Sequence, residues 1–253
     1  METRRNVGIR GVALGSAAAA TAALFVAGSA SAVIVLGNGD KVSLSEVFAQ
    51  GSDRMVCIDD KLFNFESFAS SQFAIGDYTL IGFVSQGTNS YGLHNVGFDL
   101  TGPLGDGSPG DGGVHEMNLQ YSVAVKADAY ERGVRLCDAR LTFNGSAGGI
   151  GSFARVDETV FDLDANQLLG QLSVFDFFGP PPDTRLTDGR DFCAEGAPGF
   201  RAFEINKDLK FFAAQANGFA TASFVRQEFS QVPAPGAVAL IALAGIVGRR
   251  RRG

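Results

Sequence analysis

Apolar and polar residues alternate along several stretches of the chain, which is the pattern of strands with one buried face. The clearest case is residues 114–126, where Met117 and Tyr121 fall on one side and Glu116 and Gln120 on the other. Such alternation is typical of an antiparallel sheet that packs on one side and meets water on the other. This segment is therefore expected to be a half-buried strand.

Similar runs predict about ten strands in all, and the last two, residues 201–213 and 218–229, are expected to form a hairpin. Ser43 and Glu46 stand at capping-box spacing, which predicts one or two helical turns there. No long amphipathic helix separates the strands, so an all-β antiparallel sandwich is favoured over a βαβ fold. The runs that predict strands are residues 33–36, 55–58, 61–68, 78–84, 93–100, 114–126, 134–143, 153–161, 168–178, 201–213 and 218–229.

Turn residues interrupt this pattern at several places. Residues 102–113 and 179–199 are rich in glycine and proline and are expected to be surface loops. Asn144-Gly145 is a strong turn signal and is expected to end the strand before it.

The N-terminus has the layout of a secretory signal peptide. Residues 1–10 carry three arginines, residues 12–27 are uncharged and mostly apolar, and Ala30 and Ala32 supply the small residues that a signal peptidase reads. Residues 1–32 are therefore expected to be removed during export. A buried helix is the alternative, and the adjacent arginines leave a twin-arginine route open beside the ordinary basic region.

The C-terminus, residues 232–253, has three parts that resemble a second sorting address. Pro233 and Pro235 hold the chain extended, and an apolar run follows at residues 236–248. As a helix this run would rise about 20 Å, short of the hydrocarbon core of about 30 Å, so transient membrane contact is expected rather than a permanent anchor. A basic cluster then favours the cytoplasmic face: Arg249, Arg250, Arg251 and Arg252.

This tail resembles the PEP-CTERM sorting signal of bacteria, which consists of Pro-Glu-Pro, a hydrophobic stretch and an arginine cluster. Here Pro233-Ala234-Pro235 replaces the central glutamate by alanine. The resemblance implies export, processing near these prolines by the membrane protease exosortase, and exopolysaccharide as a candidate partner.

The part between the two ends, residues 33–231, also resembles the β-rich ectodomains that precede such tails. Those domains have no defined activity, so the resemblance implies no catalytic residue. It is carried by short stretches, among them Asp60-Lys61-Leu62-Phe63-Asn64-Phe65, Tyr91-Gly92-Leu93, Leu141-Thr142-Phe143-Asn144-Gly145, Asn206-Lys207-Asp208-Leu209 and Gln227-Glu228-Phe229-Ser230-Gln231.

The net charge of the chain limits the kinds of partner that it is expected to bind. Residues 33–231 keep 14 of the 21 basic and 26 of the 27 acidic residues, for a net charge near −12. Nucleic acid is therefore not expected as a partner, because phosphate contacts need clustered Lys and Arg. The chain has 33 glycines, 22 phenylalanines and no tryptophan, which suits short strands with an aromatic core.

Three cysteines, Cys57, Cys137 and Cys193, are too widely spaced for a zinc knuckle. A bridge between Cys57 and Cys193 is one expectation, and three buried thiols are the alternative. An exported protein can keep a disulfide.

Candidate catalytic and metal-binding residues are few. His94 and His115 stand in no hydrolase motif and are expected to be polar surface residues. Asp106 and Asp111 could share a cation weakly, Asp157 and Glu158 should point to opposite faces of a strand, and the sequence Asp162-Leu163-Asp164-Ala165-Asn166 is expected to be a turn rather than a calcium loop. No cofactor and no catalysis are predicted.

The combined expectation is an exported protein of the cell surface or extracellular matrix with a structural or adhesive role. The alternative is a glycan-binding module or degenerate glycosidase at the same location. Uncleaved membrane anchoring by the tail is a third option. Signal peptidase, the export machinery and exosortase are the expected processing partners.

Overall fold

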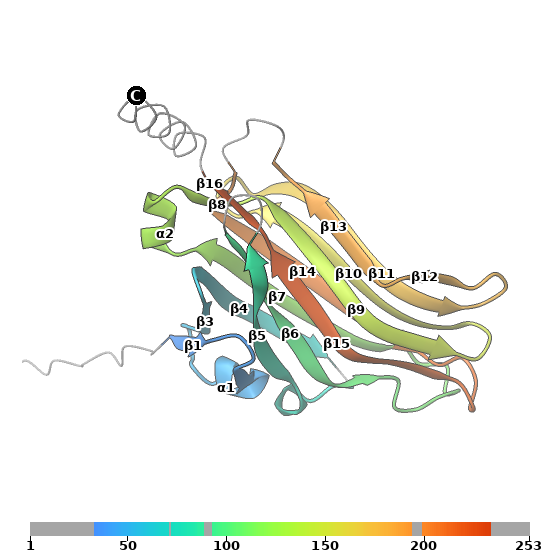
Figure 1. Ribbon diagram of the computed structural model, residues 1–253. Coiled ribbons are helices and arrows are strands. Elements are labelled where there is room, and N and C mark those ends of the chain that lie inside the picture. Colours follow the sequence, from blue (N-terminus) through green and yellow to red (C-terminus); the bar gives the residue numbers. More distant parts are fainter. Residues whose placement is uncertain (1–32, 71, 89–92, 194–198, 234–253) are drawn as a thin grey trace, which may run out of the picture. The chain divides into compact units, whose positions relative to one another are not determined.

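The computed structural model describes residues 33–70, 72–88, 93–193 and 199–233. Strands dominate this part of the chain, and its helical segments are short: α1 (Leu44–Phe48), η1 (Ile75–Asp77) and α2 (Ala127–Glu131) (Figure 1). The predicted all-β class is confirmed. The hydrophobic helices expected near the two ends lie outside the described residues. Within the described ranges, no helix has the length and apolar character needed to cross a membrane.

The larger sheet has eight strands, which are antiparallel except for the pairing of β1 with β3. In order across the sheet they are β1 (Ile34–Leu36), β3 (Met55–Ile58), β4 (Lys61–Ser70), β7 (His115–Val125), β14 (Ala202–Phe212), β10 (Ser152–Asp162), β11 (Gln167–Phe178) and β12 (Asp183–Arg185).

The second sheet has six antiparallel strands, and a two-stranded ribbon stands beside it in the fold. The six are β13 (Thr187–Asp191), β9 (Asp138–Gly148), β15 (Phe219–Phe229), β6 (His94–Gly105), β5 (Thr79–Thr88) and β2 (Lys41–Ser43). The ribbon pairs β16 (Gln231–Pro233) with β8 (Val134–Leu136).

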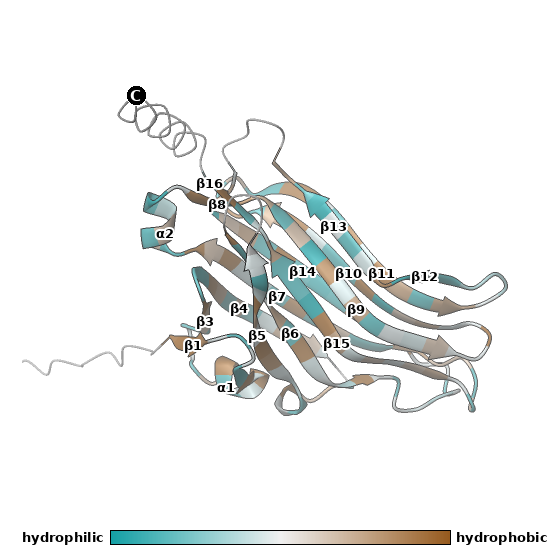
Figure 2. Cartoon of the chain, in the orientation of Figure 1, coloured by the Kyte–Doolittle hydropathy of each residue, from teal (hydrophilic) through white to brown (hydrophobic). Residues whose placement is uncertain are grey.

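The core lies between the two large sheets, where alternate residues of each strand point inward. Phe98 of β6 packs its ring 5.5 Å from that of Phe63 on β4 and 5.4 Å from that of Tyr121 on β7, so aromatic contacts join the sheets. Figure 2 shows the resulting bands of apolar and polar residues along the strands. The alternation expected for residues 114–126 is confirmed, because Met117 and Tyr121 have no exposed surface.

Two expectations about strands were wrong. The described residues contain sixteen strands rather than about ten, because the short strands β2, β12, β13 and β16 were not predicted and the run 134–143 is divided into β8 and β9. Strands β14 and β15 do not form a hairpin: β14 lies between β7 and β10 in the larger sheet, and β15 lies between β9 and β6 in the other. The chain between them changes sheets, and long-range pairing decides this rather than any local signal.

Turns were predicted less accurately from the sequence than strands were. The helical turn predicted from the capping-box spacing is confirmed as α1, and Ser43 Oγ caps it by accepting a hydrogen bond of 3.1 Å from the Glu46 amide. Asn144-Gly145 does not end its strand, because β9 passes through both residues with a register shift against β15. The predicted loop at residues 102–113 begins only after Gly105, the last residue of β6.

The other predicted loop, residues 179–199, contains β12 and β13 and closes one side of the sandwich. The chain leaves the larger sheet after β12 and enters the smaller sheet at β13. On the way, Asp188 Oδ2 accepts a hydrogen bond of 2.9 Å from the Ser173 amide, and Arg190 Nε donates one of 3.3 Å to the Gln171 carbonyl. These side chains pair backbone groups on the edge of β11, which would otherwise be open to another strand.

Candidate binding groove

Aromatic side chains line up across the outer face of the larger sheet. The strand register places Phe212 of β14 beside Phe153 of β10, Phe153 beside Phe177 of β11, and Phe177 beside Asp183 of β12. The rings of Phe153 and Phe212 are 5.6 Å apart, and Phe177 is 37% exposed. Three phenylalanines in neighbouring strands therefore form an apolar row on a face that meets water.

Charged residues form the next row on the same face. The register aligns Lys210, Arg155, Phe175 and Arg185 across four strands. Arg155 Nε lies 2.7 Å from Asp157 Oδ2, and the Arg185 guanidinium lies 5.8 Å from the centre of the Phe175 ring. The aromatic row is thus bordered by cations whose charge is partly balanced by carboxylates.

Between these rows the surface is hollowed. The hollow has a volume of about 370 Å³ and is lined by Phe153, Arg155, Phe175, Phe177 and Asp183, a set called here the aromatic groove. It combines aromatic surface with a guanidinium that donates hydrogen bonds and a carboxylate that accepts them. Pockets of this kind, apolar with a few polar groups that fix orientation, are typical of small-ligand sites.

A second hollow of about 460 Å³ continues from the aromatic groove along β10 and β11. It shares Arg155 with the groove and is more polar, with Thr159, Gln171 and Ser173 among its lining residues. The two hollows together give the outer face an aromatic end and a polar end whose lining is mostly charged.

The groove residues were not singled out in the sequence. The signal was present, because the alternation in residues 153–161 and 168–178 puts odd-numbered residues on one face. On β10 these are Phe153 and Arg155, and on β11 they are Phe175 and Phe177. Which strands would be neighbours, and so whether these residues would meet, could not be predicted.

The residues predicted to serve sorting lie almost entirely outside the described part of the chain: Ala30, Ala32, Pro235, Arg249, Arg250, Arg251 and Arg252. Pro233 is described and is the last residue of β16, where it pairs with Val134 of β8. The folded body therefore continues up to the first proline of the predicted signal.

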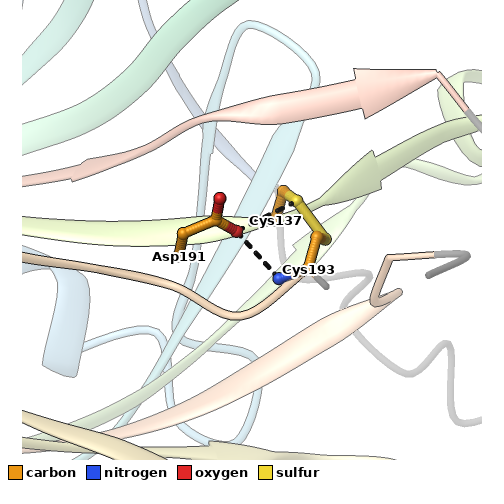
Figure 3. Close-up of side chains that lie close together, drawn as sticks. All are labelled: Cys137, Asp191 and Cys193. Atoms are coloured by element: carbon orange, nitrogen blue, oxygen red, sulfur yellow. Dashed lines mark hydrogen bonds between the residues drawn. A yellow bond between two sulfur atoms is a disulfide. The ribbon is translucent and has the colours of Figure 1, made fainter. Parts of the chain in front are cut away.

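The cysteine pairing differs from both expectations. Cys137 and Cys193 form a disulfide, and Cys57 is free and buried (Figure 3). The cause is the register of β13 with β9, which pairs Asp191 with Asp138 and brings the residues just beyond them together. Cys57 lies in the larger sheet on β3, away from this pair.

Asp191 completes this cluster, and its role is structural. Its Oδ1 accepts a hydrogen bond of 2.8 Å from the Cys193 amide and lies 3.7 Å from Cys137 Sγ (Figure 3). Sulfurs joined in a disulfide are not thiolates, which are the form of cysteine that binds metals. The cluster is therefore a covalent link between the start of β9 and the end of β13.

The histidines and the aspartates of the glycine loop serve the fold. His94 Nδ1 lies 2.9 Å from the Ser85 carbonyl, and His115 Nε2 lies 3.5 Å from Asp106 Oδ1. Both rings are half-buried rather than on the surface as expected. Asp106 accepts hydrogen bonds of 2.8 Å and 2.7 Å from the amides of Ser108 and Ala213, so its oxygens are engaged in holding the loop.

Two smaller predictions about carboxylates are confirmed. Asp157 lies on the outer face of β10, whereas the neighbouring Glu158 is only 1% exposed and points inward. Asp162 accepts a hydrogen bond of 3.0 Å from the Asp164 amide in the turn between β10 and β11, where Asn166 has a φ of 50°.

No protein-family model matches the chain, and no curated protein sequence does. Among solved structures, the enzymatically active domain of bacteriophage CBA120 tailspike protein 4 is 12% identical over 69% of this chain, with a TM-score of 0.26. This chain spans 20% of the length of that chain.

Two further solved structures are equally distant. A carbohydrate-binding module that recognises mannan is 10% identical, with a TM-score of 0.27, over 75% of this chain and 95% of its own. A cellulase derived from Cel12A of Rhodothermus marinus is 9% identical, with a TM-score of 0.23, over 68% of this chain and 99% of its own. Likenesses of this size carry no argument about fold or function. The fold is therefore assigned from the strand pairing described above.

Proposed function

We propose that the protein is an exported module of the cell surface or extracellular matrix that binds a neutral polysaccharide in the aromatic groove. The observation that carries this proposal is the row of Phe212, Phe153 and Phe177 on a water-facing sheet, with Arg155 and Asp183 beside it. Soluble proteins rarely leave aromatic surface grouped in this way without a partner for it.

The chemistry of the groove suits a sugar ring. A pyranose has apolar C–H faces that can rest on aromatic rings and hydroxyl groups at its edge that need donors and acceptors. Arg155 supplies donors and Asp183 supplies acceptors at the border of the aromatic surface. A net charge near −12 for residues 33–231 opposes strongly anionic polymers, which is why a neutral one is proposed.

Export is the second part of the proposal, and it rests on the sequence of the two ends together with the disulfide. Disulfides persist mainly in proteins that leave the cytosol. We propose that residues 1–32 direct export and that the tail, which resembles a PEP-CTERM signal, directs processing by exosortase. The body between them would have an adhesive role without catalysis. The mass of the protein recovered from its own cells tests this part. A chain that keeps both ends would contradict it.

Affinity electrophoresis in gels that contain soluble neutral polysaccharides tests binding. Retardation of the protein by at least one of them is expected, and Phe177→Ala should weaken it by about tenfold, or about 1.4 kcal/mol. Phe178→Ala is the matched control, because Phe178 is the next residue of β11, is 47% exposed and points to the opposite face. Equal losses in the two variants, or no retardation by any polymer, would contradict the proposal.

A further inference from the structure

A polar cluster lies inside the sandwich, where apolar residues are the rule. Lys207 of β14 and Glu158 of β10 are directly opposite each other in the larger sheet and are each 1% exposed. Gln227 of β15, in the other sheet, has no exposed surface. The Lys207 Nζ donates to Glu158 Oε2 and, over 2.7 Å, to Gln227 Oε1. One amine thus joins a carboxylate and a carboxamide in the core.

The cluster is incompletely satisfied. Among the described residues, no hydrogen-bond partner lies near Glu158 Oε1, Gln227 Nε2 or the hydroxyl of the neighbouring Tyr121. Buried polar atoms without partners cost about 1–3 kcal/mol each, and the majority of proteins avoid them. A cluster with a purely structural role is expected to pair these atoms by hydrogen bonds. The three unpaired atoms therefore indicate a role other than stabilising the fold by hydrogen bonding.

We propose that Lys207 and Gln227 react to form an intramolecular isopeptide bond, with Glu158 as the acid–base group. The Lys207 Nζ is the nucleophile and the side-chain carbonyl carbon of Gln227 is the electrophile. The reaction would join β14 of the larger sheet to β15 of the smaller sheet by a covalent bond through the core. It goes beyond the proposed binding function, because it concerns how the body is held together.

The step balances without any co-reactant. The Lys207 ammonium passes a proton to Glu158, and the free amine forms a C–N bond to the Gln227 carbonyl carbon. Glu158 gives that proton to Gln227 Nε2, the bond between the carbon and Nε2 breaks, and ammonia leaves. The carboxylate then takes the surplus proton from the new amide nitrogen and passes it to the ammonia. The net change is an ammonium and a carboxamide converted to an isopeptide and an ammonium ion.

Burial, the contacts of the amine and an unpaired leaving atom support this step. Burial lowers the pKa of Lys207, which Glu158 partly offsets, so the core favours the uncharged amine that can attack. The short contacts of Nζ with both partners place the nucleophile beside the carbonyl and the base. The atom that departs, Gln227 Nε2, is one of those without a partner. Its loss would remove a buried unsatisfied donor.

Lys61 provides an internal contrast. Its Nζ donates to Asp60 Oδ1 over 2.6 Å and to Gln231 Oε1 over 2.5 Å, so the same three kinds of group meet again. Here the amide is held from the other side, because Gln231 Nε2 donates to the His94 carbonyl over 3.0 Å. That hydrogen bond stabilises the unreacted amide, and no bond is proposed at Lys61.

Mass spectrometry of the full chain, purified and with its disulfide reduced, tests the proposal. The expected result is a mass lower than the sequence requires by one ammonia, and a branched tryptic peptide that joins Lys207 to Gln227. A mass that equals the sequence mass would overturn the proposal, and so would a loss of ammonia that maps to other residues, such as a cyclised N-terminal residue.

Variants separate the reaction from its surroundings. Lys207→Met and Glu158→Gln should each restore the full sequence mass, whereas Lys61→Met should leave the loss of ammonia unchanged. Persistence of the loss in Lys207→Met, or its disappearance in Lys61→Met, would overturn the assignment. If a core variant fails to fold, peptide mapping of the unchanged protein still decides whether the bond exists.

Discussion

Lys207 and Lys61 are both buried lysines that contact a carboxylate and a glutamine amide, yet their surroundings differ. The carboxylate of Glu158 has no exposed surface and comes from a neighbouring strand, whereas that of Asp60 is 17% exposed and belongs to the residue before Lys61. Gln227 Nε2 has no partner among the described residues, whereas Gln231 Nε2 has the His94 carbonyl. The difference indicates that completed hydrogen bonding separates a structural cluster from a reactive one.

The largest expected difference concerns loss of the carboxylate. Glu158→Met blocks the proposed bond and also leaves the Lys207 amine buried without its counter-ion, and the loss of the counter-ion alone costs about 3–5 kcal/mol. Asp60→Ala should cost less, about 1.5–3 kcal/mol, because Gln231 Oε1 remains as an acceptor and water reaches the site. Urea denaturation of both variants measures the two free energies of unfolding. A larger loss in Asp60→Ala would reverse the contrast.

Replacement of the whole interior cluster by apolar residues is expected to have the next largest effect. The triple variant Glu158→Met, Lys207→Met and Gln227→Met leaves no polar side chain of the cluster unpaired. Buried ion pairs replaced by well-packed apolar residues are often neutral or more stable by about 1–4 kcal/mol, so the triple variant should regain at least about 1 kcal/mol over Glu158→Met. A triple variant less stable than Glu158→Met would show that the three side chains do not act as one group.

Tyr121 gives a smaller effect at the same cluster. Its hydroxyl is buried without a partner among the described residues, and burial together with Glu158 raises the pKa of that phenol well above its usual value. Tyr121→Phe removes only this oxygen, so it should raise the free energy of unfolding by about 1 kcal/mol. Thermal unfolding against the unchanged protein measures this. A loss of stability would mean that the hydroxyl has a partner in solution.

The contrast between the two lysines could not be predicted from the sequence, although the strand that carries each lysine was predicted. Alternation predicted the strands that became β4, β7, β10, β14 and β15, because their buried faces repeat every second residue. It placed Glu158 opposite to Asp157 correctly. It could not place Gln227 against Lys207, since that contact depends on β15 entering the smaller sheet, and the sequence instead favoured a hairpin with β14.

The same limit applies to the aromatic groove and the disulfide. Local patterning put Phe153 and Phe177 on outer faces, but only the pairing of β10 with β11 makes them neighbours. Cys137 and Cys193 meet because β13 pairs with β9, and β13 fell within a segment whose prolines and glycines predicted a loop. Residues brought together by non-local pairing were missed, whereas those placed by local periodicity were found.

The smallest expected effect is a pH dependence of stability that Lys61 contributes and Lys207 does not. Burial lowers the pKa of Lys61 from the 10.5 of an exposed lysine, while Asp60 and Asp59 oppose that shift. Between the lowered value and 10.5 the unfolded chain binds more protons than the folded one, so this lysine contributes more stability as pH rises. Lys61→Met lacks this contribution, so the stability difference should move in favour of the unchanged protein as pH rises towards 10.5. Tyr78, whose pKa is raised by burial, acts in the opposite direction in both proteins, so its contribution cancels in the difference.

Lys207→Met should give no such pH dependence, because an isopeptide nitrogen does not titrate. A pH dependence equal to that of Lys61→Met would show that Lys207 is a free amine.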